Sequence, residues 1–388
     1  MLSELSCSHR PPCPGCPRFG AVDPAPDATR ELAAFCARHG VTLDVQTGAR
    51  RRFRYRARLM VRGRPGAAKI GIFGEGSHRV VDMPTCPIHH PLINRAALAL
   101  KASMRELGTS AYADAAHTGL VRALQVVVER STQTAQVMLV CNASHPGSAR
   151  VLLQRFAERL GPELHSLWWN GNPERTNTIV GPHLERVSGA EAVVEQLGGA
   201  RVFYPPAAFG QNNLDLFDRL LTQIHAGVPP ARDVVELYAG SGAIGLGLAA
   251  RSRSLVFNEV GGASLAGLAL GLAALVPGER ERCRVLAGPA DSAVGEIRND
   301  RVVIVDPPRK GLDPVVLEAL TRARPERLAY VSCGLASFLR DAEALIRGGL
   351  ELESTTLYDL FPYTAHVETL AWFRRAASMT PSVGTPAP

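Results

Sequence analysis

Residues 234–245 read VVELYAGSGAIG, an apolar run followed by three closely spaced glycines. The run predicts a buried strand, and the glycines predict a tight turn into a helix, because a residue without Cβ lets the backbone approach a ligand. Glu259 follows 19 residues after Gly240, at the end of the next apolar run, where an acid can accept hydrogen bonds from a ribose diol. The stretch therefore predicts a nucleotide-type cofactor site, although a glycine turn can also serve only to pack a helix on a sheet.

Two cofactors fit such a loop, a dinucleotide and S-adenosylmethionine. The pyrophosphate of a dinucleotide needs a helix N-terminus that is free of negative charge. Glu236 lies four residues before Gly240, at the end of the strand. This carboxylate favours the cationic methionine part of S-adenosylmethionine.

Short apolar runs and helical segments alternate through the rest of this half. Apolar runs at 255–258, 302–305 and 328–332 repeat the pattern of residues 234–237. The alternation predicts a doubly wound parallel sheet, the Rossmann-like α/β fold. We place its domain at 201–376, followed by a disordered tail at 377–388 that is rich in Pro, Ser and Thr.

Charge divides the 388 residues differently from hydropathy. Residues 1–200 contain 24 Lys and Arg against 16 Asp and Glu, whereas residues 201–388 contain 19 against 20. The whole net charge of +7 therefore comes from the first half, which favours a polyanionic partner such as nucleic acid. We find no signal peptide, and the apolar segment 261–276 is too short for a membrane span, so we expect a cytoplasmic protein without a membrane or an obligate protein partner.

The basic half mixes predicted strands and helices, and we divide this α+β region into residues 1–90 and 91–200. Arginines occupy every second position from Arg50 to Arg58, and Phe53, Tyr55 and Ala57 alternate with them after Arg52. This period of two predicts a strand with one arginine face, which we interpret as an RNA contact. The alternative is a solvated edge strand whose charges prevent aggregation.

Three further residues stand at predicted strand ends. Asp306 opens the sequence Asp-Pro-Pro-Arg, Cys333 follows an apolar run, and Glu368 precedes one. Each has a plain alternative: a rigid turn, an inert buried cysteine and a solvated carboxylate. At the edge where ligands bind, however, a cysteine can act as a nucleophile and a carboxylate as a base.

With these residues in place, the chain resembles the RNA uracil-5 methyltransferase family, which makes 5-methyluridine with S-adenosylmethionine. The matching motifs occur in the family's order over residues 202–373: Phe209-Gly-Gln211-Asn, the glycine loop with Tyr238, Glu259, Asp306-Pro-Pro-Arg309, Val-Ser-Cys333, and Phe361-Pro through His366-Val-Glu368. The family usually has Asn-Pro after the nucleophile, whereas Gly334-Leu335 follow here.

The resemblance implies roles for these residues. Cys333 would be the nucleophile and Glu368 the general base. Gln211, Tyr238, Glu259 and Asp306 would surround S-adenosylmethionine. An arginine, Arg309, stands where an aromatic residue would stack on an amine that is to be methylated, which argues against methylation of an amino nitrogen.

Four cysteines, Cys7, Cys13, Cys16 and Cys86, have the spacing of a tetrahedral zinc site or a [4Fe–4S] cluster. Their spacing is similar to that of the iron–sulfur branch of the family, so we favour the cluster over zinc. The length and the cluster resemble the shorter members that modify 23S rRNA, which we favour over tRNA as the substrate. Two rival functions remain: an NAD-dependent oxidoreductase and a non-catalytic iron–sulfur protein that binds RNA.

Overall fold

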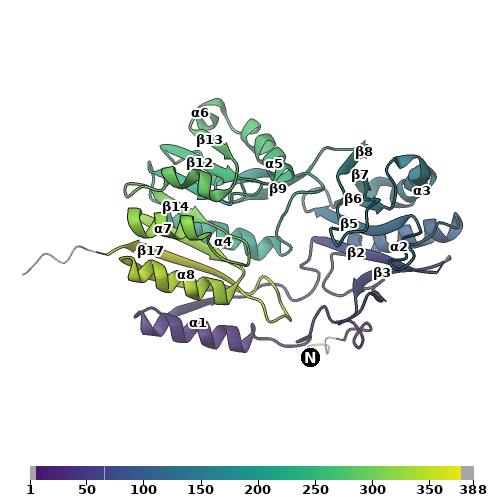
Figure 1. Cartoon of the computed structure of the whole chain (residues 1–388), viewed down its shortest axis with the longest axis horizontal. Helices are drawn as coiled ribbons and strands as arrows, with labels where there is room; N and C mark the ends of the chain where they lie inside the picture. The colour runs from purple at the N-terminus through teal and green to yellow at the C-terminus, as the bar shows by residue number, and fades with distance from the viewer. Residues whose placement is uncertain (1–5, 65, 377–388) are drawn as a thin grey trace, which may run out of the picture.

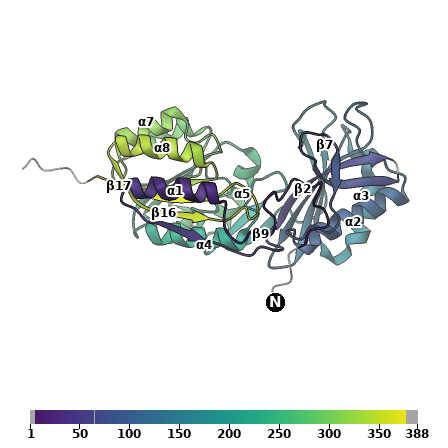
Figure 2. The ribbon, with the colours of Figure 1, turned by 90° about the horizontal axis from the view of Figure 1, so that it is seen from below.

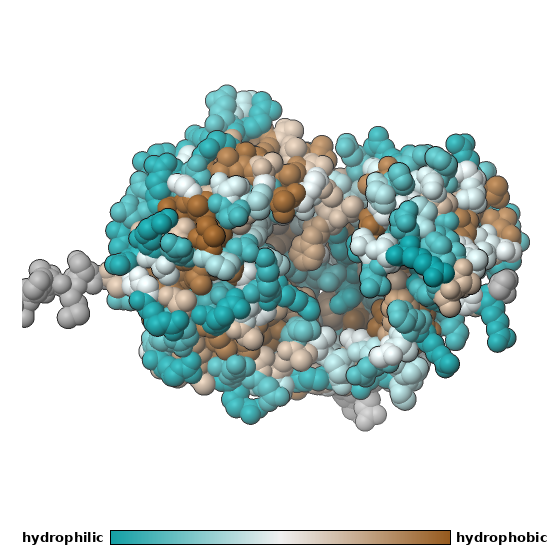
Figure 3. All heavy atoms as spheres, viewed as in Figure 1, coloured by the Kyte–Doolittle hydropathy of each residue, from teal (hydrophilic) through white to brown (hydrophobic). Residues whose placement is uncertain are grey.

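The computed structural model describes residues 6–64 and 66–376, so the predicted tail at 377–388 lies outside the described residues. The chain forms two lobes, each built on its own large sheet, which lie side by side (Figure 1). Figure 3 shows that the surface is hollowed between them.

The sheet of the first lobe has eight strands in the order β1-β16-β17-β15-β14-β11-β12-β13. All neighbouring pairs are parallel except those of β17, which runs antiparallel to both β15 and β16. The strands are β1 (Leu43–Gln46), β11 (Asp233–Leu237), β12 (Ser254–Glu259), β13 (Cys283–Ala287), β14 (Val302–Val305), β15 (Arg327–Ser332), β16 (Leu350–Tyr358) and β17 (Glu368–Arg375).

Helices cover both faces of this sheet, and Figure 2 shows α7 and α8 on the opposite side from α4. The core on one face contains Leu32 of α1, Val316 of α7 and Phe338 of α8. The core on the other face contains Leu220 of α4 and Leu268 of α5. The helices are α1 (Pro26–Arg38), α4 (Leu214–Gly227), α5 (Gly262–Ala273), α6 (Pro277–Arg280), α7 (Pro314–Ala323) and α8 (Leu335–Arg347). This is the doubly wound α/β domain expected from the sequence.

Strand order reverses at β11, because β12 lies on one side of it and β14 on the other. Ligands in open α/β sheets bind outside the carboxyl ends of the strands at such a point. Every residue of β14 is buried, as a strand covered on both faces requires. The glycine loop after β11 is therefore correctly placed for a ligand.

The second lobe contains a seven-stranded sheet in the order β4-β3-β2-β5-β6-β7-β8. Its pairs are antiparallel apart from β6 and β7, and α2 and α3 cover one face. The elements are β2 (Arg56–Arg64), β3 (Ala67–Phe73), β4 (Val80–Asp82), α2 (Pro91–Glu106), β5 (Val121–Glu129), β6 (Thr134–Cys141), α3 (Arg150–Leu160), β7 (Leu164–Gly171) and β8 (His183–Gly189).

The lobes do not divide the chain at one point. The segment 26–46 precedes the second lobe in sequence, yet β1 pairs with β16 and α1 packs on α8 in the first lobe. The hairpin of β9 (Val193–Leu197) and β10 (Ala200–Tyr204) also packs in the first lobe's core. A sequence boundary near residue 200 misses both, because partners distant in the chain are not visible in local periodicity.

Within residues 6–64 and 66–376, no helix is long and apolar enough to cross a membrane.

Candidate active site

A cavity of about 650 Å³ lies at the carboxyl ends of β11, β12, β14 and β15. It is lined by five residues predicted from the sequence: Gln211, Tyr238, Glu259, Asp306 and Cys333. They come from five separate segments of the chain, and the fold brings them together.

The glycine loop is held in place by the Glu259 carboxylate. One carboxylate oxygen accepts from Gly240 N at 2.8 Å, and the other accepts from Gly261 N at 2.6 Å and Val260 N at 2.9 Å. Gly240 has φ +58°, a backbone conformation that residues other than glycine rarely adopt. Glu259 thus positions the turn, and its carboxylate still has acceptor positions for a ligand hydroxyl.

Glu236 points into the same cavity and is only 1% exposed. Burial and the nearby charge of Asp306 raise its pKa well above the usual value. Its Oε2 has no hydrogen-bond partner, and a Cβ on Gly245 would collide with that oxygen. A buried carboxylate oxygen without a partner is costly, so Glu236 fits a donor or cationic group supplied by the ligand.

Cys333 lies immediately after β15 and is half-buried. Burial raises the pKa of its thiol to about 11, and the charges of Glu368 and Asp306 add to the rise. Arg309 opposes it, because its guanidinium stabilises the thiolate. The Cys333 thiol therefore lies close to two carboxyl groups, Glu368 and Asp306, and to one cation, Arg309.

Glu368 is the first residue of β17, beside the end of β15, and is almost completely buried. Burial and the charge of Asp306 raise its pKa well above the usual value, and both of its oxygens lack a partner. Burial also raises the pKa of Asp306 to about 7. Two neighbouring carboxyl groups that repel each other in this way bind a proton more tightly than isolated ones.

The four predicted cysteine ligands line one small cavity in the other part of the molecule: Cys7, Cys13, Cys16 and Cys86. Burial and the neighbouring cysteines raise the pKa of Cys16. Arg54 lies beside Cys16 and Cys86, and its buried Nε has no partner. In the part of the chain that the structure describes, no three His, Cys, Asp or Glu side chains are arranged to hold a single metal ion.

The prediction of a strand with one arginine face from Arg50 to Arg58 is wrong for the first half of that segment. β2 begins only at Arg56, and the preceding arginines do not form a strand. Arg50 pairs with Asp359 at 2.9 Å, Arg54 lies at the cysteine cavity, and Arg56 donates to the carbonyl of Ala208. Spacing alone did not distinguish arginines that bind protein carbonyls from arginines that face solvent.

The contacts that hold the segment 204–213 in place were not predicted from the sequence. This segment, called here the linker, contains Gln211, which lines the cofactor cavity. Gln125 donates to Pro206 O, Gln136 donates to Tyr204 O at 3.3 Å, and Tyr55 N donates to Asn212 O at 3.0 Å. A buried glutamine inside an apolar strand was the available signal, since it must find a polar partner.

Residues 291–376 match the family profile described as tRNA (uracil-5-)-methyltransferase. A protein of Protochlamydia amoebophila described as an uncharacterized RNA methyltransferase is 34% identical over 96% of this chain and 98% of its own length. An uncharacterized RNA methyltransferase of Gloeobacter violaceus is 34% identical over 80% of this chain and 67% of its own length.

Among solved structures, the fold resembles that of the Pyrococcus abyssi tRNA (uracil-54, C5)-methyltransferase in complex with S-adenosyl-L-homocysteine. The TM-score is 0.74 at 22% identity, and the match covers 90% of this chain and 82% of the other. At that identity the likeness concerns the fold.

Proposed function

Because the chain belongs to the family of S-adenosylmethionine-dependent RNA (uracil-5-)-methyltransferases, we propose that it methylates carbon 5 of one uridine in 23S rRNA through a covalent bond to Cys333. One observation carries the proposal. Cys333 and Asp306 line the cofactor-sized cavity, and Glu368 is close enough to both for its charge to be felt by the thiol.

The cavity residues fit S-adenosylmethionine. Glu236 offers a buried oxygen without a partner to the cationic end, and Glu259 offers acceptors to the ribose hydroxyls. The glycine loop between them leaves room for backbone contact. When bound, S-adenosylmethionine supplies the methyl group on its sulfonium.

The first step is addition of the Cys333 thiolate to carbon 6 of uracil. Carbon 5 alone is too weak a nucleophile, but addition at carbon 6 moves an electron pair to give an enolate over carbons 4 and 5. Carbon 5 then takes the methyl group, and the electron pair of the broken sulfur–methyl bond stays on the sulfur of S-adenosylhomocysteine. Arg309 assists the addition because its charge lowers the pKa of the Cys333 thiol, which burial otherwise raises.

Glu368 completes the reaction as the general base. It removes the proton from carbon 5, the electron pair restores the double bond between carbons 5 and 6, and the Cys333 thiolate leaves. Burial and the charge of Asp306 raise the pKa of Glu368, so its carboxylate is a stronger base than a free one. The target nucleotide must also leave its stack to enter the cavity, at a cost of a few kcal/mol.

The preference for 23S rRNA over tRNA rests on the cysteine pattern, which resembles that of the family members that modify 23S rRNA. The basic first half of the chain supports an RNA partner in either case.

We propose further that Cys7, Cys13, Cys16 and Cys86 hold a [4Fe–4S] cluster rather than zinc. Their convergence on one cavity supports a shared group. Arg54, buried beside two of them without a partner for its Nε, would offset the negative charge of four thiolates. Methyl transfer moves no electrons, so the group would act by holding this part of the chain together.

The methylation test uses purified protein, methyl-labelled S-adenosylmethionine and unmodified 23S rRNA and tRNA transcripts. We expect 5-methyluridine in the rRNA digest only, and none from the Cys333→Ala variant. Label in tRNA alone would overturn the rRNA assignment. Tight RNA binding without label in either RNA would favour a non-catalytic protein. Oxidation or reduction of added nicotinamide cofactor would favour an oxidoreductase.

The metal test is separate and uses protein purified without oxygen. About four irons and four acid-labile sulfides per chain, lost in Cys86→Ser, are expected for the cluster. One zinc per chain would contradict it.

A further inference from the structure

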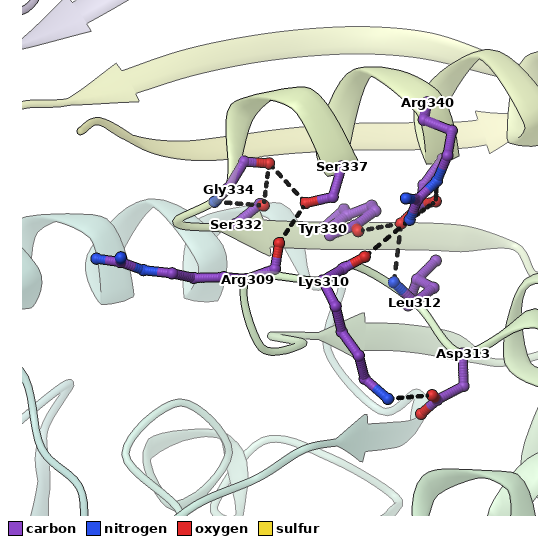
Figure 4. Close-up of polar contacts among 10 residues, drawn as sticks. Arg309, Lys310, Leu312, Asp313, Tyr330, Ser332, Gly334, Ser337 and Arg340 are labelled. Atoms are coloured by element: carbon purple, nitrogen blue, oxygen red, sulfur yellow. Dashed lines mark hydrogen bonds and ion pairs between the residues drawn. The ribbon is translucent and has the colours of Figure 1, made fainter. Parts of the chain in front are cut away.

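Helix α8 begins two residues after Cys333 and is bound to the loop that follows Asp306 (Figure 4). Ser337 Oγ lies 2.8 Å from both Arg309 O and Gly334 O, and it can donate to either carbonyl. One turn later, Arg340 Nη2 donates to Lys310 O at 2.9 Å. A single helix face therefore contacts the loop that carries Arg309 and the turn that carries the nucleophile.

Asp341 anchors the far end of the same loop. Its side chain is completely buried and accepts from Tyr330 Oη at 2.7 Å, Leu312 N at 2.8 Å and Arg340 Nε at 2.9 Å. A buried carboxylate is tolerated only when it is paired and hydrogen-bonded, as this one is. Because Tyr330 belongs to β15, Asp341 connects the loop to the strand that ends at Cys333.

The absence of a side chain at two glycines allows this close contact. A Cβ on Gly334 would lie 2.7 Å from both Arg309 O and Ser337 Oγ, and a Cβ on Gly311, where φ is +87°, would collide with Asp341. The turn after Cys333 can thus approach the Arg309 loop only with glycine at position 334. This gives a physical reason for Gly334 where the family usually has asparagine.

We propose that Ser337, Arg340 and Asp341, called here the α8 brace, are positioning residues that hold Arg309 beside the Cys333 thiol. None of the three lines the cofactor cavity, so they act through the loop and not on the substrate. The inference rests on the proposed role of Cys333 as nucleophile. It assigns to the brace the task of keeping the thiol reactive.

The test is a double-mutant cycle on the full-length protein, with Ser337→Ala, Arg309→Met and the combined variant. The readout is the rate at which iodoacetamide alkylates Cys333 at pH 8, followed by mass spectrometry of the peptide that contains Cys333. Neither RNA nor S-adenosylmethionine is needed. Glu343→Gln is the matched control, since Glu343 lies on the same helix but binds Arg38 and His39 instead of the loop.

We expect Arg309→Met to slow alkylation, because the thiolate loses its neighbouring cation. Ser337→Ala should slow it in the same direction, by about threefold, but add nothing in the Arg309→Met background. Asp341→Asn should behave like Ser337→Ala, and if that variant does not fold, Ser337→Ala decides. Ser337→Thr should restore the wild-type rate, and Glu343→Gln should leave it unchanged.

Two results would overturn the inference: a wild-type rate in folded Ser337→Ala, or the same factor in both backgrounds, which would indicate a change in access alone. Methylation assays then separate this inference from the proposed function. Coupled alkylation in a protein that methylates neither RNA would support the brace and reject the proposed reaction. In an active protein, kcat should fall in Ser337→Ala more than the KM for S-adenosylmethionine rises.

Discussion

At the scale of single residues, Glu368 and Asp306 influence each other's charge beside the Cys333 thiol. Glu368 is buried, Asp306 is partly exposed, and the charge of Asp306 raises the pKa of Glu368. A carboxylate with a raised pKa is a stronger base than a free one, so removal of Glu368 should affect the last chemical step most.

Glu368→Gln is therefore expected to stop the reaction after methylation. The glutamine amide cannot take the proton from carbon 5, so the RNA should stay bonded to Cys333. We expect a protein–RNA adduct that survives denaturing gel electrophoresis and contains labelled methyl. The double variant with Cys333→Ala should give no adduct. Full turnover by Glu368→Gln would exclude Glu368 as the base.

Asp306→Asn should stabilise the protein while it abolishes activity. The pKa of Asp306 rises from 3.8 to about 7 on folding, so the folded state binds its proton more tightly than the unfolded state. Its contribution to stability is therefore full below about pH 4 and declines as the pH rises to 7. The variant should melt at least about 2 °C higher at pH 8 and almost equally at pH 4. An equal gain at both pH values would contradict this assignment.

Motif order and strand ends were enough to select Cys333, Glu368 and Asp306 from the sequence. The structure brings the three close together, and their catalytic roles stay predictions. The brace was not predicted, although Ser337 and Asp341 are polar residues one turn apart on the apolar side of a helix, a pattern that signals buried partners. What no sequence pattern could supply was the identity of those partners, which belong to another loop.

At the scale of elements, the segment 204–213 lies between β10 and α4, is hydrogen-bonded to the second lobe and forms one wall of the cofactor cavity. Arg56 is central to it. Its guanidinium donates to Ala208 O, lies over the ring of Tyr204 and stands close to Gly210. Through Arg56, the second lobe therefore fixes the position of Gln211.

Arg56→Met should weaken cofactor binding without changing the chemistry. Without the Arg56 guanidinium, the segment 204–213 and its Gln211 become less ordered. The Kd for S-adenosylhomocysteine, measured by calorimetry, should therefore rise about tenfold, which is equivalent to the loss of one or two hydrogen bonds. Arg64→Met is the control, because Arg64 is exposed at the other end of the same strand. Unchanged affinity in folded Arg56→Met would show that the linker is held by other contacts.

Arg50 is another arginine that the period of two predicted to contact RNA, and its role in stability can be tested in the same way. It pairs with Asp359, whose side chain is only 3% exposed. Arg50→Met would leave that carboxylate buried and unpaired, and we expect a loss of about 3–5 kcal/mol in the free energy of unfolding, partly restored by adding Asp359→Asn. The salt dependence of RNA binding should not change. A reduced salt slope with wild-type stability would return Arg50 to the RNA surface.

The two arginines show where period-two reasoning fails. The alternation correctly separates faces within β2, where Ala57, Leu59 and Val61 enter the core under α2 and α3. It does not reveal that the strand starts at Arg56, or that the chain before it crosses to the first lobe. Contacts between lobes depend on the whole fold, which a local pattern does not contain.

At the scale of the whole molecule, the cysteine cavity and Glu368, the proposed base, are connected through a short loop. Tyr363 packs in the same cluster as Cys13, Cys16 and Cys86, and it lies five residues before Glu368. Its ring is 5.0 Å from that of Phe19, and its carbonyl accepts from Arg18 N at 3.0 Å. The N-terminal loop therefore supports the segment that delivers Glu368 to β17.

Removal of the group held by the cysteines should consequently impair the base but not the cofactor site. The residues that we propose bind S-adenosylmethionine lie at the ends of β11, β12 and β14 and in the segment 204–213, away from this loop, so the affinity for S-adenosylhomocysteine should stay within about twofold. Turnover should fall, and the RNA adduct expected for Glu368→Gln should accumulate in protein stripped of metal under chelation and oxidation. Cys16→Ser should reproduce both effects. Parallel loss of cofactor affinity and turnover would mean that the cysteine cavity supports the whole fold, and unchanged turnover would disconnect it from Glu368.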